Sequence, residues 1–226
     1  MKIRAERLLK EWCDAILSYR VQLNTPYTDG ALLCPACHLI HGRIADLCFP
    51  LTVLWKKTGD ETYLKQADKL IDWTEFNLKS EKGFWFNDIG SRWIGTSAFG
   101  ALSIGEALYH YGDVLPVDVK EKWMNIFLRI CDGFVSETGK LRPLINYYCA
   151  ISALLAMAWR ITGEEAYYEV SKKWLEIVLD RFDEEGLLYG EKYPITFEDS
   201  THTIDMGYNL EESLPLLLRY SKLTGE

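Results

Sequence analysis

Four segments of the chain carry the pattern of a half-exposed helix. In three of them apolar residues recur at i, i+3 or i+4, and i+7, while Lys, Asp and Glu occupy the opposite face. The apolar stripes consist of Tyr63, Ala67, Leu70 and Ile71, of Val119, Trp123, Ile126, Phe127 and Ile130, and of Tyr167, Val170, Trp174, Ile177 and Val178. We therefore predict outer helices over roughly 3–20, 60–77, 117–134 and 164–181.

The segments between these helices have no polar face. IADLCFPLTVLW, TSAFGALSIGEAL, CAISALLAMAW and NLEESLPLLL are apolar or small almost all round, and such helices must be covered on both sides. They predict inner helices over roughly 39–57, 94–111, 144–161 and 206–223. Alternation of enclosed and half-exposed helices is typical of an all-α toroid built from helical hairpins, which is the fold class we predict.

A short turn motif marks the repeat. TG followed by Asp or Glu occurs at Thr58, Thr162 and Thr224, and a degenerate copy starts at Tyr111. Intervals of roughly 50–60 residues suit a helical-hairpin repeat. Glycine ends a helix in a left-handed cap, and the acidic residue favours the next helix start. The long connections, at about 21–37, 78–93, 135–143 and 182–205, then leave from one end and form a mouth.

The number of helices is low for a closed ring, because a six-hairpin toroid has twelve and the pattern yields eight. We therefore expect residues 1–226 to form a single α/α-toroid domain truncated at its C-terminal end. The alternative is a compact eight-helix domain. An open edge exposes apolar inner-helix surface, so we also expect a homo-oligomer formed through it.

Composition narrows the range of partners. The 226 residues are 48% hydrophobic with a net charge of −8, which argues against nucleic acid or an anionic membrane as partner. No apolar run reaches the roughly 18 residues of a membrane span. MKIRAERLLKEWCDAILSYR lacks the apolar core of a signal peptide. The sequence as it stands predicts a cytoplasmic protein with free cysteines; a missing leader would make it periplasmic or extracellular.

Three stretches point to a known family: DGALLCPACHLIHGRIADLCFPL (29–51), WFNDIGSRWIG (85–95) and DMGYNLEESLPLLLRYSKLTG (205–225). With them the chain resembles six-hairpin glycosidase-like (α/α)6-toroid proteins of bacterial polysaccharide utilisation. Neighbouring groups are exo-β-glucuronidases, unsaturated glucuronyl hydrolases and heparinase II/III-like lyases. The resemblance implies a carbohydrate-active enzyme for uronic-acid-containing glycans, with a glycan substrate and no cofactor. Because full-length members of that family have further C-terminal hairpins, the resemblance leads us to expect an incomplete toroid in residues 1–226.

A glucuronidase-like glycoside hydrolase is the first expectation. Hydrolysis needs two carboxyl groups on opposite sides of the scissile bond. Asp88 lies in an aromatic loop, Asp205 at an inner helix start, and the adjacent candidates Glu211 and Glu212 one turn further. Trp85 and Trp93 offer flat surfaces for sugar rings. Structural alternatives are a plain helix cap for Asp205 and an ion pair for Glu212.

A polysaccharide lyase is the second expectation. It must neutralise a uronate carboxylate, remove the C5 proton and protonate the leaving oxygen, which Asn, Arg, His and Tyr can do. The complete set of candidates is catalytic Asp88, His202, Asp205, Tyr208 and Glu211, with substrate contacts from His41, Arg43, Trp85, Trp93, Asn146 and Tyr147. Arg43 could equally pair with Asp46, and at least one of the adjacent tyrosines could simply pack. A third reading is a non-catalytic helical scaffold or sugar-binding remnant.

CPACH at residues 34–38 could be read as a haem, redox or zinc motif. A haem pocket and a βαβ context are both missing from the pattern. Cys34, Cys37, His38 and His41 have the ligand types of zinc, but so short a span gives poor tetrahedral geometry. We therefore expect no metal here, and a structural loop that aims His41 and Arg43 into the mouth.

Overall fold

The computed structural model of the protein describes residues 2–25, 27–40, 42–141, 143–190 and 203–226, with side chains from residue 4 onward. The chain divides into two compact units, Met1–Ile126 and Phe127–Glu226, and each is described by itself. The prediction of a single domain is not tested by this division.

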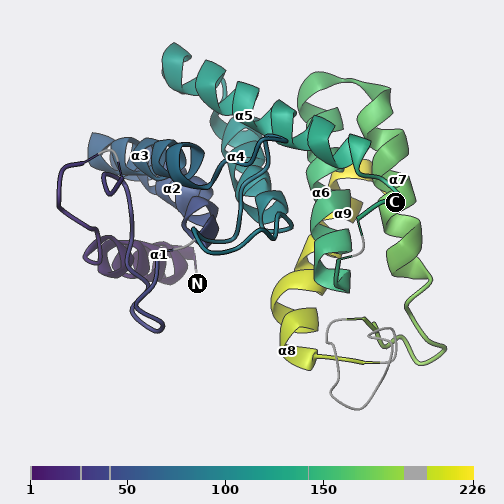
Figure 1. Ribbon diagram of the computed structural model, residues 1–226. Coiled ribbons are helices and arrows are strands. Elements are labelled where there is room, and N and C mark those ends of the chain that lie inside the picture. The colour runs from purple at the N-terminus through teal and green to yellow at the C-terminus, as the bar shows by residue number, and fades with distance from the viewer. Residues whose placement is uncertain (1, 26, 41, 142, 191–202) are drawn as a thin grey trace. The chain divides into compact units, whose positions relative to one another are not determined.

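The first unit consists of α1 (Lys2–Leu17), the 3₁₀ segment η1 (Gly42–Leu47), α2 (Cys48–Thr58), α3 (Glu61–Leu78), α4 (Ser97–Tyr111) and the start of α5 (Val117–Ser136). Helix α2 packs against α1, α3 and α4 (Figure 1). The connection between α1 and η1 rests on α3. A Cβ on Gly30 would lie 2.1 Å from the carbonyl oxygen of Lys69, so only glycine fits there.

The second unit contains the end of α5, then α6 (Ile145–Thr162), α7 (Glu165–Leu179), α8 (Met206–Tyr208), the π-helical segment η3 (Asn209–Ser213) and α9 (Leu214–Thr224). Helix α6 forms a hairpin with α7 and packs on its other side against η3 and α9 (Figure 1). From Ile145 to Ala158 all residues of α6 are buried except the half-buried Tyr147, as the sequence predicted for an inner helix.

All eight predicted helical segments are present, within a few residues of the predicted bounds. Two inner helices begin irregularly, and in both a proline follows closely. Pro50 lies in the first turn of α2 behind the 3₁₀ segment, and Pro215 in the first turn of α9 behind the π segment. A proline ring clashes with the carbonyl four residues earlier in a continuous α-helix, which accounts for the change of helix type at each place.

The repeated turns have the same contacts in both units. Gly59 and Gly163 adopt φ of 73° and 77°, and each amide closes the preceding helix. Trp55 Nε1 donates to Glu61 at 3.0 Å, and Trp159 Nε1 donates to Glu165 at 3.1 Å. Gly112 in the degenerate copy differs, because its φ of −55° is right-handed.

A second repeated contact joins successive outer helices. The Tyr63 hydroxyl donates to Asp14 and the Tyr167 hydroxyl donates to Asp132, each at 2.6 Å. Burial, followed by the bond to Asp132, raises the pKa of Tyr167, so the phenol stays a donor. Both hairpins therefore attach to the preceding outer helix in the same way.

The last inner helix is not enclosed as the sequence predicted. Leu210, Leu214 and Leu218, spaced four residues apart, are 62%, 41% and 57% exposed. The opposite face is buried through Asn209, Ser213, Tyr220 and Leu223. Within the described part of the chain, α9 has α6 on one side, and its other side faces solvent.

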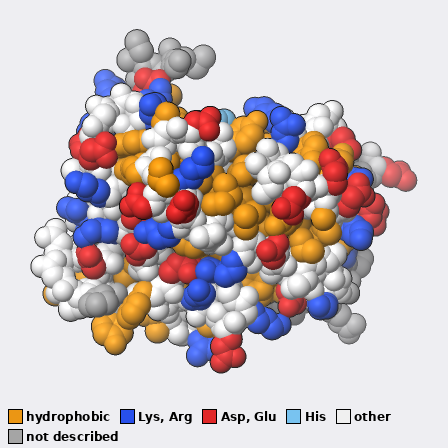
Figure 2. Space-filling model, turned by 90° about the horizontal axis from the view of Figure 1, so that it is seen from above, with side chains coloured by type: hydrophobic (Ala, Val, Ile, Leu, Met, Phe, Trp, Pro, Cys, Tyr) orange, Lys and Arg blue, Asp and Glu red, His pale blue; other side chains and the backbone are white. Residues whose placement is uncertain are grey.

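The surface carries charges of both signs. On the face seen in Figure 2, Lys and Arg side chains alternate with Asp and Glu, and hydrophobic side chains lie between them. None of the helices that the structure describes has the length and hydropathy needed to cross a membrane.

Candidate functional site

The first turn of α6 and the π segment η3 meet through a buried amide. Asn146 is 4% exposed, and its Nδ2 donates to Glu212 Oε2 at 2.7 Å. Its Oδ1 accepts the backbone N–H of Tyr147 at 2.9 Å. The side chain is held at both ends, so its position is fixed relative to both helices.

Extended backbone after α7 brings these two segments together. The Ile145 amide donates to the Gly190 carbonyl at 3.0 Å, and the Gly190 amide donates to the Thr203 carbonyl at 2.7 Å. Asn209 Nδ2 donates to the Leu188 carbonyl at 2.9 Å. The start of α6 and the start of η3 are therefore anchored to the same stretch of chain.

The acidic and tyrosine candidates of this second unit have distinct positions. Asp205 Oδ1 accepts the amides of Gly207 and Tyr208 at 3.0 and 3.3 Å, so it is the helix cap that the sequence allowed. Tyr208 is 47% exposed. Glu211 is exposed, whereas its neighbour Glu212 is half-buried against Asn146. The π segment thus directs Glu212, and not the predicted Glu211, towards the start of α6.

In the first unit, Arg43 contacts Asp46 and Phe99. Its Nε donates to Asp46 Oδ2 at 2.6 Å, and its guanidinium lies 4.4 Å from the centre of the Phe99 ring. The pair with Asp46 was the structural alternative for Arg43. The ring of Phe99 and the carboxylate of Asp46 therefore both help to orient the Arg43 side chain.

The predicted aromatic platform is partly wrong. Trp85 is 1% exposed, its indole N–H donates to Glu75 at 2.6 Å, and its ring packs against Gly100. It is a core residue, because the absence of a side chain on Gly100 lets the indole reach α4. Trp93 is half-buried at the loop surface, and its carbonyl accepts the Asn87 amide at 3.0 Å.

Asp88 shapes the loop in which it lies. Its Oδ1 accepts the Gly90 amide at 2.8 Å and its Oδ2 accepts from Asn87 Nδ2 at 3.1 Å. The loop meets the start of η1, where the Gly42 amide donates to the Asn87 carbonyl at 2.6 Å. A Cβ on Gly42 would lie 2.9 Å from the Phe86 carbonyl oxygen. Glycine at this position therefore sets where Arg43 emerges.

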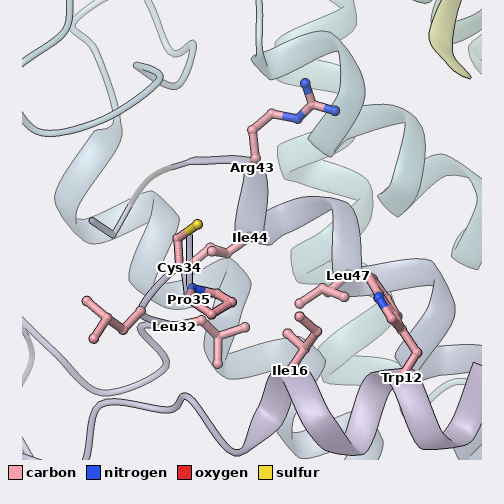
Figure 3. A pocket seen from close by; sticks show the side chains of 9 residues that line it. Trp12, Ile16, Leu32, Cys34, Pro35, Arg43, Ile44 and Leu47 are labelled. Carbon is pink, nitrogen blue, oxygen red and sulfur yellow. The ribbon is translucent and has the colours of Figure 1, made fainter. Parts of the chain in front are cut away.

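An apolar pocket of about 180 Å³ opens beside Arg43 between α1, η1 and the loop that joins them (Figure 3). Trp12 and Ile16 of α1 point towards Ile44 and Leu47 of η1, and the Arg43 side chain extends away from them. This pocket was not predicted from the sequence, because its lining comes from three separate segments.

Two predicted site residues, His41 and His202, lie outside the described residues. Among the residues that the structure does describe, no three His, Cys, Asp or Glu side chains gather as a metal site would require. The contacts of Glu212 and Phe99 were missed as site features. Glu212 was one of two adjacent candidates, and choosing between them required the π segment.

The folds of several solved structures match this chain. One is a protein from Salmonella enterica serovar Paratyphi A described as a possible member of the GH105 family, at 14% identity, TM-score 0.73, and coverage of 96% of this chain and 65% of that one. A polysaccharide lyase matches at 12% identity, TM-score 0.65, and coverage of 81% and 61%. A glycosyl hydrolase family 88 protein from Bacteroides vulgatus matches at 11%, TM-score 0.59, and coverage of 79% and 62%. These likenesses define the class of fold as an (α/α) toroid, as the sequence predicted.

The sequence itself identifies the family. Residues 9–226 match the ulvan lyase N-terminal domain, and the chain belongs to that family. It is 34% identical to a broad-specificity ulvan lyase of Formosa agariphila over an alignment covering 95% of this chain. The alignment covers 34% of that lyase, so this chain spans about a third of its relative's length.

Proposed function

We propose that this chain is the α/α-toroid part of a polysaccharide lyase that cleaves uronic-acid-containing glycans by β-elimination. The observation that carries the proposal is membership of the ulvan lyase N-terminal domain family, together with the similarity to a broad-specificity ulvan lyase. The lyase was the second expectation from the sequence, and these similarities favour it over the glucuronidase-like hydrolase.

The chemistry of β-elimination suits the residues of the second unit. The reaction needs a donor that neutralises the uronate carboxylate, a base for the C5 proton and an acid for the leaving oxygen. Tyr208 presents an exposed phenol one turn before Glu212, and we assign it a role in proton transfer. Asn146, held by Glu212, places an amide at the start of α6, and Tyr147 follows it with a half-buried ring.

The acidic candidates fit a hydrolase less well. Asp88 already accepts two hydrogen bonds inside its own loop, and Asp205 caps α8. A hydrolase needs one carboxyl group to deliver a proton and another to attack or to activate water. Carboxylates that already accept hydrogen bonds from neighbouring residues of their own loop or helix are poorly placed for either task. His41 and His202 remain candidates for the base, and Arg43 for a contact with the uronate group.

The experiment compares two products. The folded chain is incubated with a uronate-containing polysaccharide, and absorbance is followed near ~232–235 nm, where the unsaturated product of elimination absorbs. An aryl β-glucuronide serves as the parallel hydrolase substrate. We expect absorbance to rise on the polysaccharide and no aryl alcohol to be released.

A variant tests the assigned residue. Tyr208→Phe should lower kcat by about 10²–10⁴-fold, the usual contribution of a group that transfers a proton. Tyr19→Phe is the matched control, since Tyr19 is 44% exposed and lies outside the proposed site; it should leave kcat unchanged. Aryl alcohol release would overturn the lyase in favour of the hydrolase. A folded chain without activity on either substrate would favour the scaffold or sugar-binding reading.

A further inference from the structure

Cys34 and Cys37 lie in a tight turn between α1 and η1. The turn comprises Pro35–Cys37, and its ends are joined by two backbone bonds of 2.9 Å: from the His38 amide to the Cys34 carbonyl, and from the Cys34 amide to the Leu39 carbonyl. Cα atoms three residues apart in such a turn lie within about 7 Å, and disulfides span about 4.4–6.8 Å between Cα atoms. The turn therefore brings the two thiols into bonding range without rearranging the fold.

The sulfur of Cys34 lies among hydrogen-bond donors. The backbone N–H of Cys37, the backbone N–H of Ala36 and the Cys37 thiol all bond to it, and together they lower the pKa of Cys34. Cys37 is exposed and Cys34 is half-buried, so a small molecule can reach the pair.

The other four cysteines are in the opposite situation. Cys13, Cys48, Cys131 and Cys149 have no exposed surface. Burial raises the pKa of Cys13 to about 11 and also raises the pKa of Cys48 and Cys131. Thiolates are the reactive species, so the turn is where thiol chemistry is favoured.

A metal explains the pair less well than redox chemistry does. A closed zinc site needs four ligands, and the described residues include no cluster of three His, Cys, Asp or Glu side chains. Two thiols in one turn are sufficient for a disulfide. The geometry points to a modification site: we propose that Cys34 and Cys37 form a reversible disulfide by exchange with small-molecule disulfides.

The exchange runs in two steps. The Cys34 thiolate attacks one sulfur of the small disulfide, the S–S bond of that molecule breaks, and its other half leaves as a thiolate that takes up a proton. Cys37 then loses its proton to solvent and attacks the Cys34 sulfur, which releases the second half as a thiol. Two protein thiols are oxidised, and one small disulfide is reduced to two thiols.

The site borders the apolar pocket. Cys34 and Pro35 line it opposite Trp12 and Ile16 (Figure 3). A covalent bond between Cys34 and Cys37 would fix the Cys34 side chain at the rim of this pocket. Oxidation would therefore change the pocket beside Arg43. This inference does not depend on the function proposed above.

The test uses oxidised glutathione as the probe. The native chain is incubated with it, quenched with acid and mapped by mass spectrometry. We expect loss of two reactive thiols per chain, a Cys34–Cys37 disulfide in the peptide map and full reversal by dithiothreitol. The four buried cysteines should react only after unfolding, which makes them an internal control.

Two variants assign the roles. Cys37→Ser should accumulate a stable mixed disulfide between Cys34 and glutathione, because the second thiol is missing. Cys34→Ser should react on the order of tenfold more slowly, because the favoured thiolate is missing. Native wild type that forms no disulfide, or a Cys37→Ser variant whose adduct is not on Cys34, would overturn the proposal. Alkylation rates of the six thiols in the wild type provide the same ranking without any substitution.

Discussion

At the scale of residues, the most informative contact joins Asn146 to Glu212, which are 66 positions apart. Asn146 was a candidate for substrate contact, and Glu212 lies in one of the stretches that carry the family resemblance, DMGYNLEESLPLLLRYSKLTG. The sequence did not show that these two residues form a hydrogen bond with each other. Adjacent glutamates look equivalent in a sequence, whereas the π segment exposes Glu211 and turns Glu212 inward.

The two glutamates allow a matched comparison. Glu212→Gln keeps an acceptor for Asn146 but removes its charge, so a charge-assisted bond becomes a neutral one. We expect the free energy of unfolding to fall by about 1 kcal/mol. Glu211→Gln alters an exposed side chain and should stay within about 0.5 kcal/mol of wild type. Urea denaturation of both variants gives the difference; equal effects would contradict the inward position of Glu212.

At the scale of elements, the hairpins repeat in their contacts as well as in their helices. Tyr63 of α3 and Tyr167 of α7 occupy corresponding places in their outer helices, and each donates to an aspartate of the preceding outer helix. The sequence repeat predicted both tyrosines as members of apolar stripes. A buried hydroxyl group needs a polar partner. The partners, Asp14 and Asp132, lie on neighbouring helices, so only the tertiary structure identifies them.

The hydrogen bond from Tyr63 to Asp14 makes the stability of the fold depend on pH. The Lys10 ammonium first, and the Tyr63 hydroxyl second, lower the pKa of Asp14 below its ordinary value. Asp14 therefore stabilises the fold above its unfolded pKa of about 3.9, and this stabilisation is lost as pH falls through the lower, folded pKa. Tyr63→Phe raises the folded pKa towards the unfolded one, so less stability is lost in acid.

Denaturation at two pH values measures this effect. At pH 7, Tyr63→Phe should lower the free energy of unfolding by about 0.5–1 kcal/mol, a small value because Asp14 is partly solvated. The gap to wild type should narrow as pH falls through the lowered folded pKa of Asp14, because a protonated carboxyl group no longer gains from the Tyr63 hydroxyl as donor. Tyr167→Phe is the equivalent variant in the other unit. It should lower the free energy of unfolding at pH 7 by at least as much, since Tyr167 is buried. A gap that widens in acid would contradict the assigned partner.

At the scale of the whole molecule, the question is what covers the exposed apolar surface of the last helix. The chain spans about a third of the length of the ulvan lyase that it resembles. Leu210, Leu214 and Leu218 form an exposed stripe along η3 and α9. Apolar stripes of this kind usually mark contact surfaces, and the sequence had predicted that this helix would be covered.

We expect the isolated chain to self-associate through this stripe. Sedimentation velocity should show an average mass that rises with concentration for wild type. The double variant Leu214→Glu and Leu218→Glu should return it to the monomer mass. Leu179→Glu is a suitable control, because Leu179 is 55% exposed on α7, outside the stripe; it should associate like wild type. A wild type that stays monomeric at every concentration would rule the contact out.

The sequence by itself determined the helices, their order and the fold class. Apolar periodicity and glycine caps are local signals, and both act within a few residues along the chain. Tertiary structure alone decided which candidates meet. It buried Trp85 behind Gly100, gave Arg43 the ring of Phe99, and selected Glu212 over Glu211. Such contacts join distant segments, and their geometry depends on the packing of whole helices and on local departures from the α-helix.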